Sequence, residues 1–125
     1  MSLTITSQAG DGFVTIRPSG SLDSKTYTAL SEHVVSLIKH KPRVVVFDLK
    51  DVHYISSAGV RVIRWTQKTM RAAGGEIAVT NLQPIVRKVL EVIMALRTLN
   101  VMESAADLDR YLAGIQKKAL GEGKD

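Results

Sequence analysis

Hydrophobic and polar residues alternate along two short stretches near the start of the chain. Leu3 and Ile5 alternate with threonines, and residues 13–17 alternate again after the glycine-rich segment 10–12. A period of two is typical of strands with one buried face, so these stretches predict a β-hairpin. Proline and glycine in residues 18–20 predict that the second strand ends there.

Three later stretches carry apolar residues at the three- and four-residue spacing of a helix. Asp23 or Ser24 stands where the N-cap of the first would lie, and that helix should end near Lys39. Pro84 suits the first turn of the next, and Ser104 should cap the last. The apolar positions are Tyr27, Leu30, Val34, Leu37 and Ile38; Val86, Val89, Leu90, Ile93 and Leu96; and Leu108, Tyr111, Leu112 and Ile115.

A further helix is predicted over residues 57–73, which are rich in helix-compatible side chains. The pair Gly74-Gly75 follows, and glycine easily adopts the left-handed conformation that often ends a helix. We therefore expect this helix to stop at the glycine pair.

Short apolar segments between the helices predict strands. Residues 44–47 form an uninterrupted β-branched run typical of a central strand covered on both faces. Residues 76–80 and 99–102 should be further strands, and residues 50–56 a connection. Strands that alternate with helices favour parallel pairing through right-handed crossovers. The prediction is a mixed α/β sheet of four to five strands with about four helices.

The composition fits one globular domain. With 125 residues, 45% of them apolar, the chain can bury one core, which we place in residues 1–120 ahead of a polar tail at 121–125. Residues 44–47 are far shorter than the roughly 20 apolar residues that a membrane span needs. The absence of cysteine excludes disulfides and fits a reducing compartment. We expect a cytoplasmic protein.

The formal charge of +5 arises from 17 Lys and Arg against 12 Asp and Glu. Such a balance favours acidic partners, nucleic acid or anionic lipid. Only three Tyr, two Phe and one Trp could stack on bases, so direct nucleic-acid binding is not expected.

Catalytic and metal-binding patterns are weak. His33, His40 and His53 lack the close spacing of a zinc site. Asp48 and Asp51 flank a loop, where solvation or capping explains them better than a cation. The chain contains no phosphate-binding glycine loop and no nucleophile elbow. We expect no enzyme activity, no metal and no cofactor.

Ser56 and Ser57 lie at the start of the predicted helix 57–73, beyond the C-terminal end of the buried strand, where open α/β sheets tend to place functional groups. Two interpretations are open. One serine could be an N-cap whose hydroxyl accepts a backbone N–H. Alternatively, a serine could accept a phosphate, because a helix N-terminus tolerates negative charge.

Basic residues recur along the same helix. Arg61, Arg64, Lys68 and Arg71 are three or four residues apart, so they should form one stripe that begins beside the serines. The stripe is either an ordinary solvated face or a docking surface for an acidic partner, which a nearby phosphate would partly neutralise.

Four segments together resemble the STAS domain, the fold shared by bacterial anti-sigma-factor antagonists and the cytoplasmic part of sulfate transporters. Residues 20–23 resemble the family's turn into its first helix, and residues 45–49 its central strand. Residues 74–76 resemble the turn after its second helix, and residues 55–59 its phosphorylation loop. The resemblance covers nearly the whole chain.

The resemblance implies roles for individual residues. Ser57 matches the phosphoacceptor, Ser56 a position that is often Asp, Ala58 the small residue and Gly59 the glycine of the loop. Asp23 matches an acidic position that contributes to partner recognition. We expect these residues, apart from the acceptor, to bind the partner together with the basic stripe.

The resemblance also implies a cycle. The unmodified antagonist binds an anti-sigma factor and so frees the sigma factor. The anti-sigma factor's own kinase activity, which uses ATP and magnesium, then phosphorylates the serine and ends the complex. This chain would regulate transcription indirectly as a phosphoprotein, and homodimerisation is left open.

At two positions the chain departs from the family pattern. Ser56 replaces the usual acid and becomes a rival acceptor. Met94-Ala95 stands where the family often has a Ser-Gly turn, so the third long helix should continue further. Two other functions stay open: a non-switching adaptor subunit of a larger signalling or lipid-transport assembly, and an anion or nucleotide binder that uses the helix N-terminus and Arg61.

Overall fold

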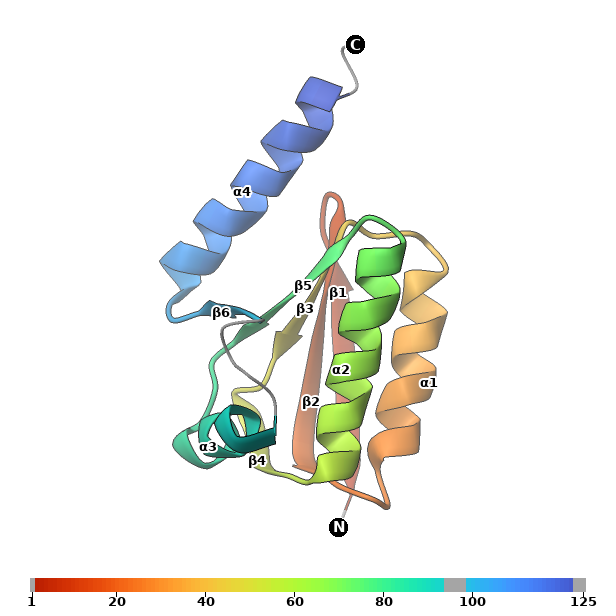
Figure 1. Cartoon of the computed structure of the whole chain (residues 1–125), viewed down its shortest axis with the longest axis vertical. Helices are drawn as coiled ribbons and strands as arrows, with labels where there is room; N and C mark the ends of the chain where they lie inside the picture. The colour runs from red at the N-terminus through yellow and green to blue at the C-terminus, as the bar shows by residue number, and fades with distance from the viewer. Residues whose placement is uncertain (1, 94–98, 123–125) are drawn as a thin grey trace.

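A computed structural model describes residues 2–93 and 99–122 of the chain. Its described part is a mixed sheet of six strands with helices on both faces (Figure 1). In chain order the elements are β1 (Leu3–Ala9), β2 (Phe13–Leu22), α1 (Tyr27–Ile38), β3 (Val44–Asp48), β4 (Asp51–Ile55), α2 (Ser57–Ala72), β5 (Glu76–Thr80), α3 (Pro84–Ile93), β6 (Asn100–Met102) and α4 (Ala105–Glu122).

Strand β3 is central, as predicted. The order is β1-β2-β3-β5-β6, in which β1 and β2 form the predicted antiparallel hairpin and the later pairings are parallel. Strand β2 has two partners on one side: its first half pairs with β3, and its second half pairs with β4.

The two faces of the sheet are covered by different helices. Val45 and Phe47 face a core shared with α1, α2 and α3, whereas Val44 and Val46 pack with Leu112 of α4. These four apolar residues of β3 are fully buried. The uninterrupted apolar run of β3 therefore follows from helices on both sides.

The prediction that residues 18–20 end the second strand is wrong, because β2 continues to Leu22. Pro18 still pairs with Ile5 of β1. It lies between the residues that pair with β3 and those that pair with β4, so its missing N–H interrupts no ladder on that side. Gly20 has a φ of 124° beside a register shift, and glycine tolerates this bulge.

The prediction that residues 50–56 form a simple connection is also wrong, because residues 51–55 are strand β4. Val52 and Ile55 are buried, while the residues between and before them are exposed. The two buried residues are three positions apart, which is not the two-residue period of a strand. The sheet consequently has one strand more than expected.

The helices begin and end close to their predicted positions. Thr26, and neither Asp23 nor Ser24, is the N-cap residue of α1. Ser104 caps α4 as predicted, since its hydroxyl accepts the Asp107 N–H at 3.1 Å. Helix α4 includes the first two residues of the predicted tail. Residues 94–98, with Leu96 and Met94-Ala95, and residues 123–125 lie outside the described part. No described helix has both the length and the apolar character needed to cross a membrane.

Candidate functional site

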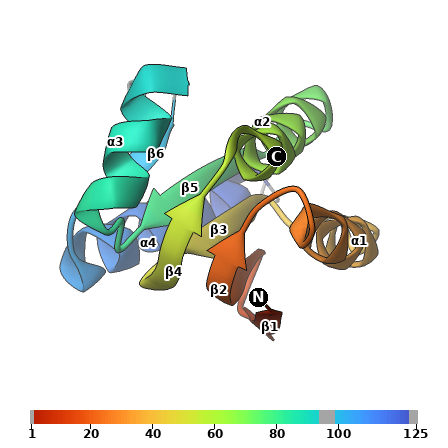
Figure 2. The ribbon, with the colours of Figure 1, turned by 90° about the horizontal axis from the view of Figure 1, so that it is seen from below.

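The predicted site residues meet where two parallel strands end side by side. Leu22, the last residue of β2, lies opposite Ile55, the last residue of β4. The Ser56 N–H donates to the Leu22 carbonyl at 2.9 Å. The chain leaves one strand through Asp23 and the other through the two serines, so these residues lie at the end of the molecule where α1 and α2 begin (Figure 2).

The two serines differ in access. Ser57 is the first residue of α2 and is exposed. Ser56 is the N-cap residue, but its hydroxyl makes no cap hydrogen bond, and its oxygen is buried with no partner among the described residues. One of the two serines is thus the N-cap residue by position, but its hydroxyl does not cap the helix, and Ser57 is the accessible serine.

The start of α2 suits a negative charge on Ser57. The first N–H groups of a helix lack intrahelical acceptors and form the positive end of its dipole. The first turn of α2 contains no acidic side chain to compensate that end. A phosphate on Ser57 would meet unpaired donors and no like charge in this turn.

Gly59 allows α2 to start against the ends of both strands. A Cβ there would lie 2.7 Å from Leu22 Cγ and 2.9 Å from Ile55 Cγ1, both too close for a real contact. Ala58 is also buried. Gly59 therefore keeps residues 55–59, which we call the serine loop, close to the strand ends, and both Ala58 and Gly59 expose little surface.

Asp23 organises the turn that leads into α1. Its Oδ1 accepts the backbone N–H of Lys25 at 2.9 Å and that of Thr26 at 3.2 Å. The Thr26 hydroxyl accepts the Asp23 N–H at 2.9 Å and donates to the Ser21 carbonyl at 2.8 Å. The bond from the Lys25 N–H lowers the pKa of Asp23, with help from Thr26. Asp23 therefore presents a fixed negative charge beside the serines.

The basic stripe lies on the exposed side of α2, as predicted. Arg61, Arg64 and Lys68 are exposed and form no ion pair with the described residues. Arg71, also exposed, continues the stripe. Arg61, Arg64 and Lys68 are therefore available to an incoming anionic surface.

A groove of about 210 Å³ lies between α1 and α2, next to the serine loop. Tyr27, predicted to face the core, is 40% exposed on one side, and Trp65, which no sequence pattern singled out, is 43% exposed on the other. We call this feature the α1–α2 groove; its lining residues are Tyr27, Ser31, Ala58, Arg61, Val62 and Trp65.

The comparison with protein families decides the classification. The model of the STAS domain matches residues 4–108. This chain belongs to the STAS domain family.

Two relatives and one solved protein are similar to this STAS domain. BtrV of Bordetella bronchiseptica, assigned as an anti-sigma factor antagonist, is 34% identical over 66% of this chain and 71% of its own length. An anti-sigma F factor antagonist of Paenibacillus polymyxa is 29% identical over 73% and 79%.

The solved protein is the anti-sigma factor antagonist SpoIIAA. In its unphosphorylated form it superposes with a TM-score of 0.75 at 18% identity, covering 88% of this chain and 97% of its own. In its phosphorylated form the TM-score is 0.67 at 17% identity, with 88% and 99% covered. At this identity the likeness concerns the fold.

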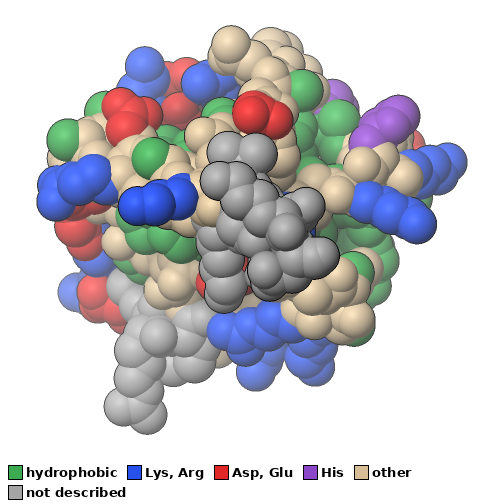
Figure 3. All heavy atoms as spheres, turned by 90° about the horizontal axis from the view of Figure 1, so that it is seen from above, with side chains coloured by type: hydrophobic (Ala, Val, Ile, Leu, Met, Phe, Trp, Pro, Cys, Tyr) green, Lys and Arg blue, Asp and Glu red, His purple; other side chains and the backbone are tan. Residues whose placement is uncertain are grey.

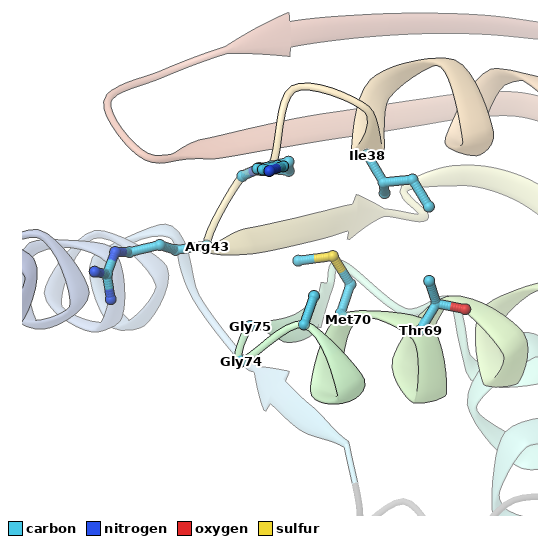
Figure 4. Close-up of a pocket in the computed structure, with 9 residues that line it drawn as sticks. Ile38, Arg43, Thr69, Met70, Gly74 and Gly75 are labelled. Atoms are coloured by element: carbon cyan, nitrogen blue, oxygen red, sulfur yellow. The ribbon is translucent and has the colours of Figure 1, made fainter.

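The opposite end of this STAS domain contains a hollow of about 630 Å³ where α1 and α2 finish. In Figure 4 the Ile38 and Met70 side chains lie at the hollow, and the Arg43 side chain points away from them. Seen from this end, Lys and Arg side chains gather in separate groups around the rim of the molecule (Figure 3). None of the predicted partner-binding residues lines this hollow.

Within the described part of the STAS domain, no three His, Asp or Glu side chains converge as metal ligands would. Asp48 instead forms an ion pair with Arg17 at 3.2 Å and accepts the Asn81 amide at 3.1 Å. It also accepts the Lys50 N–H in the turn between β3 and β4.

A Gly59→Ala substitution should lower the free energy of unfolding by about 1–3 kcal/mol, because the new methyl group would collide with Leu22 and Ile55. Urea denaturation measures this change. The matched control is Gly114→Ala on α4, where a Cβ meets nothing within 4 Å and should stabilise the helix by up to about 1 kcal/mol. Equal effects of the two substitutions would contradict the packing role of Gly59.

The stability contributed by the Asp23 charge should depend on pH. Because its pKa is lowered by folding, the contribution is complete above the ordinary value of 3.8 and is lost as pH falls through the lower folded pKa. Wild type should exceed Asp23→Asn in stability at neutral pH, and the difference should shrink below pH 3.8. Asp109→Asn, at an exposed position on α4, is the control. A difference that grows on acidification would be inconsistent with this role.

Proposed function

We propose that this chain is an anti-sigma-factor antagonist that acts as a phosphorylation-controlled binding switch in the bacterial cytoplasm. It binds an anti-sigma factor with serine-kinase activity while Ser57 is unmodified, and it is released when Ser57 is phosphorylated. The observation that carries this proposal is the exposed Ser57 at the N-terminus of α2, beside Asp23. Family membership and the names of the relatives support it.

Access distinguishes the two serines as acceptors. A kinase must bring the hydroxyl oxygen close to and in line with the phosphate that it transfers. The Ser56 oxygen is buried, and the Ser56 N–H is held by Leu22, so reaching that oxygen would require the turn to open. Ser57 requires no such opening, which favours it over its rival.

The same site can accommodate both states of the free chain. A phosphoserine carries a charge of about −2, which the helix N-terminus and Arg61, four residues later, can partly balance. In a complex, however, the phosphate would enter an interface fitted to a neutral hydroxyl. An unpaired dianion there costs several kcal/mol, so binding and phosphorylation should exclude each other.

The remaining predicted site residues either lie on the surface that a partner would contact or hold that surface in shape. Asp23, Ser56 and the exposed cations Arg61, Arg64 and Lys68 lie at or near the surface that a docked partner would cover. The buried Ala58 and Gly59 contribute by setting the shape of that surface. The kinase brings ATP and magnesium, and this chain contributes the acceptor without acting as an enzyme.

Incubation with ATP and the kinase recovered from the native cell should place one phosphate on Ser57, as located by mass mapping. Ser57→Ala should abolish the phosphate, and Ser56→Ala should leave it unchanged because the Ser56 oxygen is buried. A phosphate that persists in Ser57→Ala would transfer the acceptor role to Ser56.

Binding to the same kinase tests the switch itself. Ser57→Ala should bind and Ser57→Asp should bind much more weakly, because only Asp brings a charge into the interface. Equal binding of the two variants in a pull-down would favour the non-switching adaptor function instead.

A further inference from the structure

We propose that the α1–α2 groove docks an acidic segment of the partner protein, which inserts one large apolar side chain between Tyr27 and Trp65. The identity of the partner as the kinase rests on the function proposed above. The chemistry of the segment rests on the groove alone.

The groove has the size and lining of a side-chain pocket. Its volume of about 210 Å³ is below the roughly 300–1,000 Å³ typical of small-molecule sites. Tyr27 and Trp65 stand exposed on its two sides, and buried Val62 contributes to its lining. Tyr and Trp are the residues that most often dominate the binding energy of an interface when a partner buries them.

The positive charge around the groove favours an acidic segment as its occupant. Arg61 lines it, and Arg64 and Lys68 continue along the same exposed side of α2 without ion pairs in the described structure. Helix α2 contains no Asp or Glu, and the first turn of α1 has none either. The carboxylate of Asp23 lies in the turn before α1 and does not line the groove. Guanidinium groups pair most strongly with carboxylates, so a segment that carries Asp or Glu around its apolar anchor fits this surface.

The groove also connects docking to the switch. Ala58, which lines it, directly follows Ser57, and Arg61 lies four residues after Ser57 on the same helix. A phosphate on Ser57 would compete with the partner's carboxylates for Arg61 and would repel them. Phosphorylation would thus weaken docking without any change of fold.

Trp65 offers a direct probe because it is the only tryptophan in the chain. The full chain is titrated with a labelled synthetic peptide in which Leu recurs at helical spacing among Glu residues, and with a matched peptide that has Lys in place of Glu. The Glu peptide should shift Trp65 emission to shorter wavelength, and its affinity should fall as salt is added. The Lys peptide should neither shift the Trp65 emission nor bind with a measurable affinity.

Variants test the same contacts with both the peptide and the kinase. Trp65→Ala and Arg64→Glu should each lower the affinity about tenfold or more, measured by anisotropy of the labelled peptide and by direct titration of the kinase. The matched controls change the same properties elsewhere: Ile85→Ala removes an exposed apolar side chain of α3, and Lys117→Glu reverses an exposed charge of α4. Both controls should bind as wild type.

The outcomes separate this inference from the proposed function. If the kinase binds Trp65→Ala and Arg64→Glu as tightly as wild type while Ser57→Asp fails to bind, the docking groove is refuted and the switch stands. If the Glu peptide binds through Trp65 but the kinase neither binds nor phosphorylates the chain, the groove stands and the switch fails. Unchanged Trp65 emission with the Glu peptide, together with unchanged kinase affinity of the variants, overturns the inference.

Discussion

The parallel pairing of β2 with β4 determines where every candidate functional group lies. The chain enters α1 just after β2 and α2 just after β4, so the register that sets Leu22 opposite Ile55 also sets Asp23 beside Ser56. In a strand, a slip by one residue moves every side chain to the other face. Gly59 adds a second constraint, because its missing Cβ lets α2 begin in contact with both strand ends. Together these contacts leave the Ser57 side chain outside the packed core.

At this site, the residues that fix the shape of the loop are different from the residues that could contact a partner. Residues that hold the loop are buried and apolar or small, and they would be covered whether or not a partner is bound. Residues that could meet a partner are charged or aromatic and at least partly exposed, and they lie in the turn before α1, at the start of α1 and along the exposed side of α2. Adding a phosphate to Ser57 changes the charge of the second group without disturbing the first. A switch built in this way does not require the fold to rearrange.

Sequence periodicity predicted the elements that have a strong repeat. Helices α1, α3 and α4 follow apolar residues at helical spacing, and the hairpin strands β1 and β2 begin with alternating residues. Helix α2 was predicted instead from helix-compatible residues ahead of a glycine pair, and β3 from an uninterrupted apolar run. Strand β4 was missed because its buried residues, Val52 and Ile55, are three positions apart and so lack the period of a strand. The continuation of β2 was missed because Pro18 lies at a change of partner strand, which no local pattern reveals.

The candidate site was predictable only in part. The family motif pointed to Ser57 and Ser56, but which serine is accessible depends on the burial of one oxygen atom against the end of β2. The exposure of Tyr27 follows from its position at the first turn of α1, where helical spacing alone predicted burial. The α1–α2 groove joins residues more than thirty positions apart, so it emerges only when the two helices pack side by side.

The most direct test of the switch is a calorimetric titration of the kinase with two forms of the intact chain, one unmodified and one carrying phosphoserine at position 57. The unmodified form should bind, and the phosphorylated form should lose affinity by about a hundredfold or more, as expected for an unpaired charge in an interface. Equal affinities for the two forms would contradict the account.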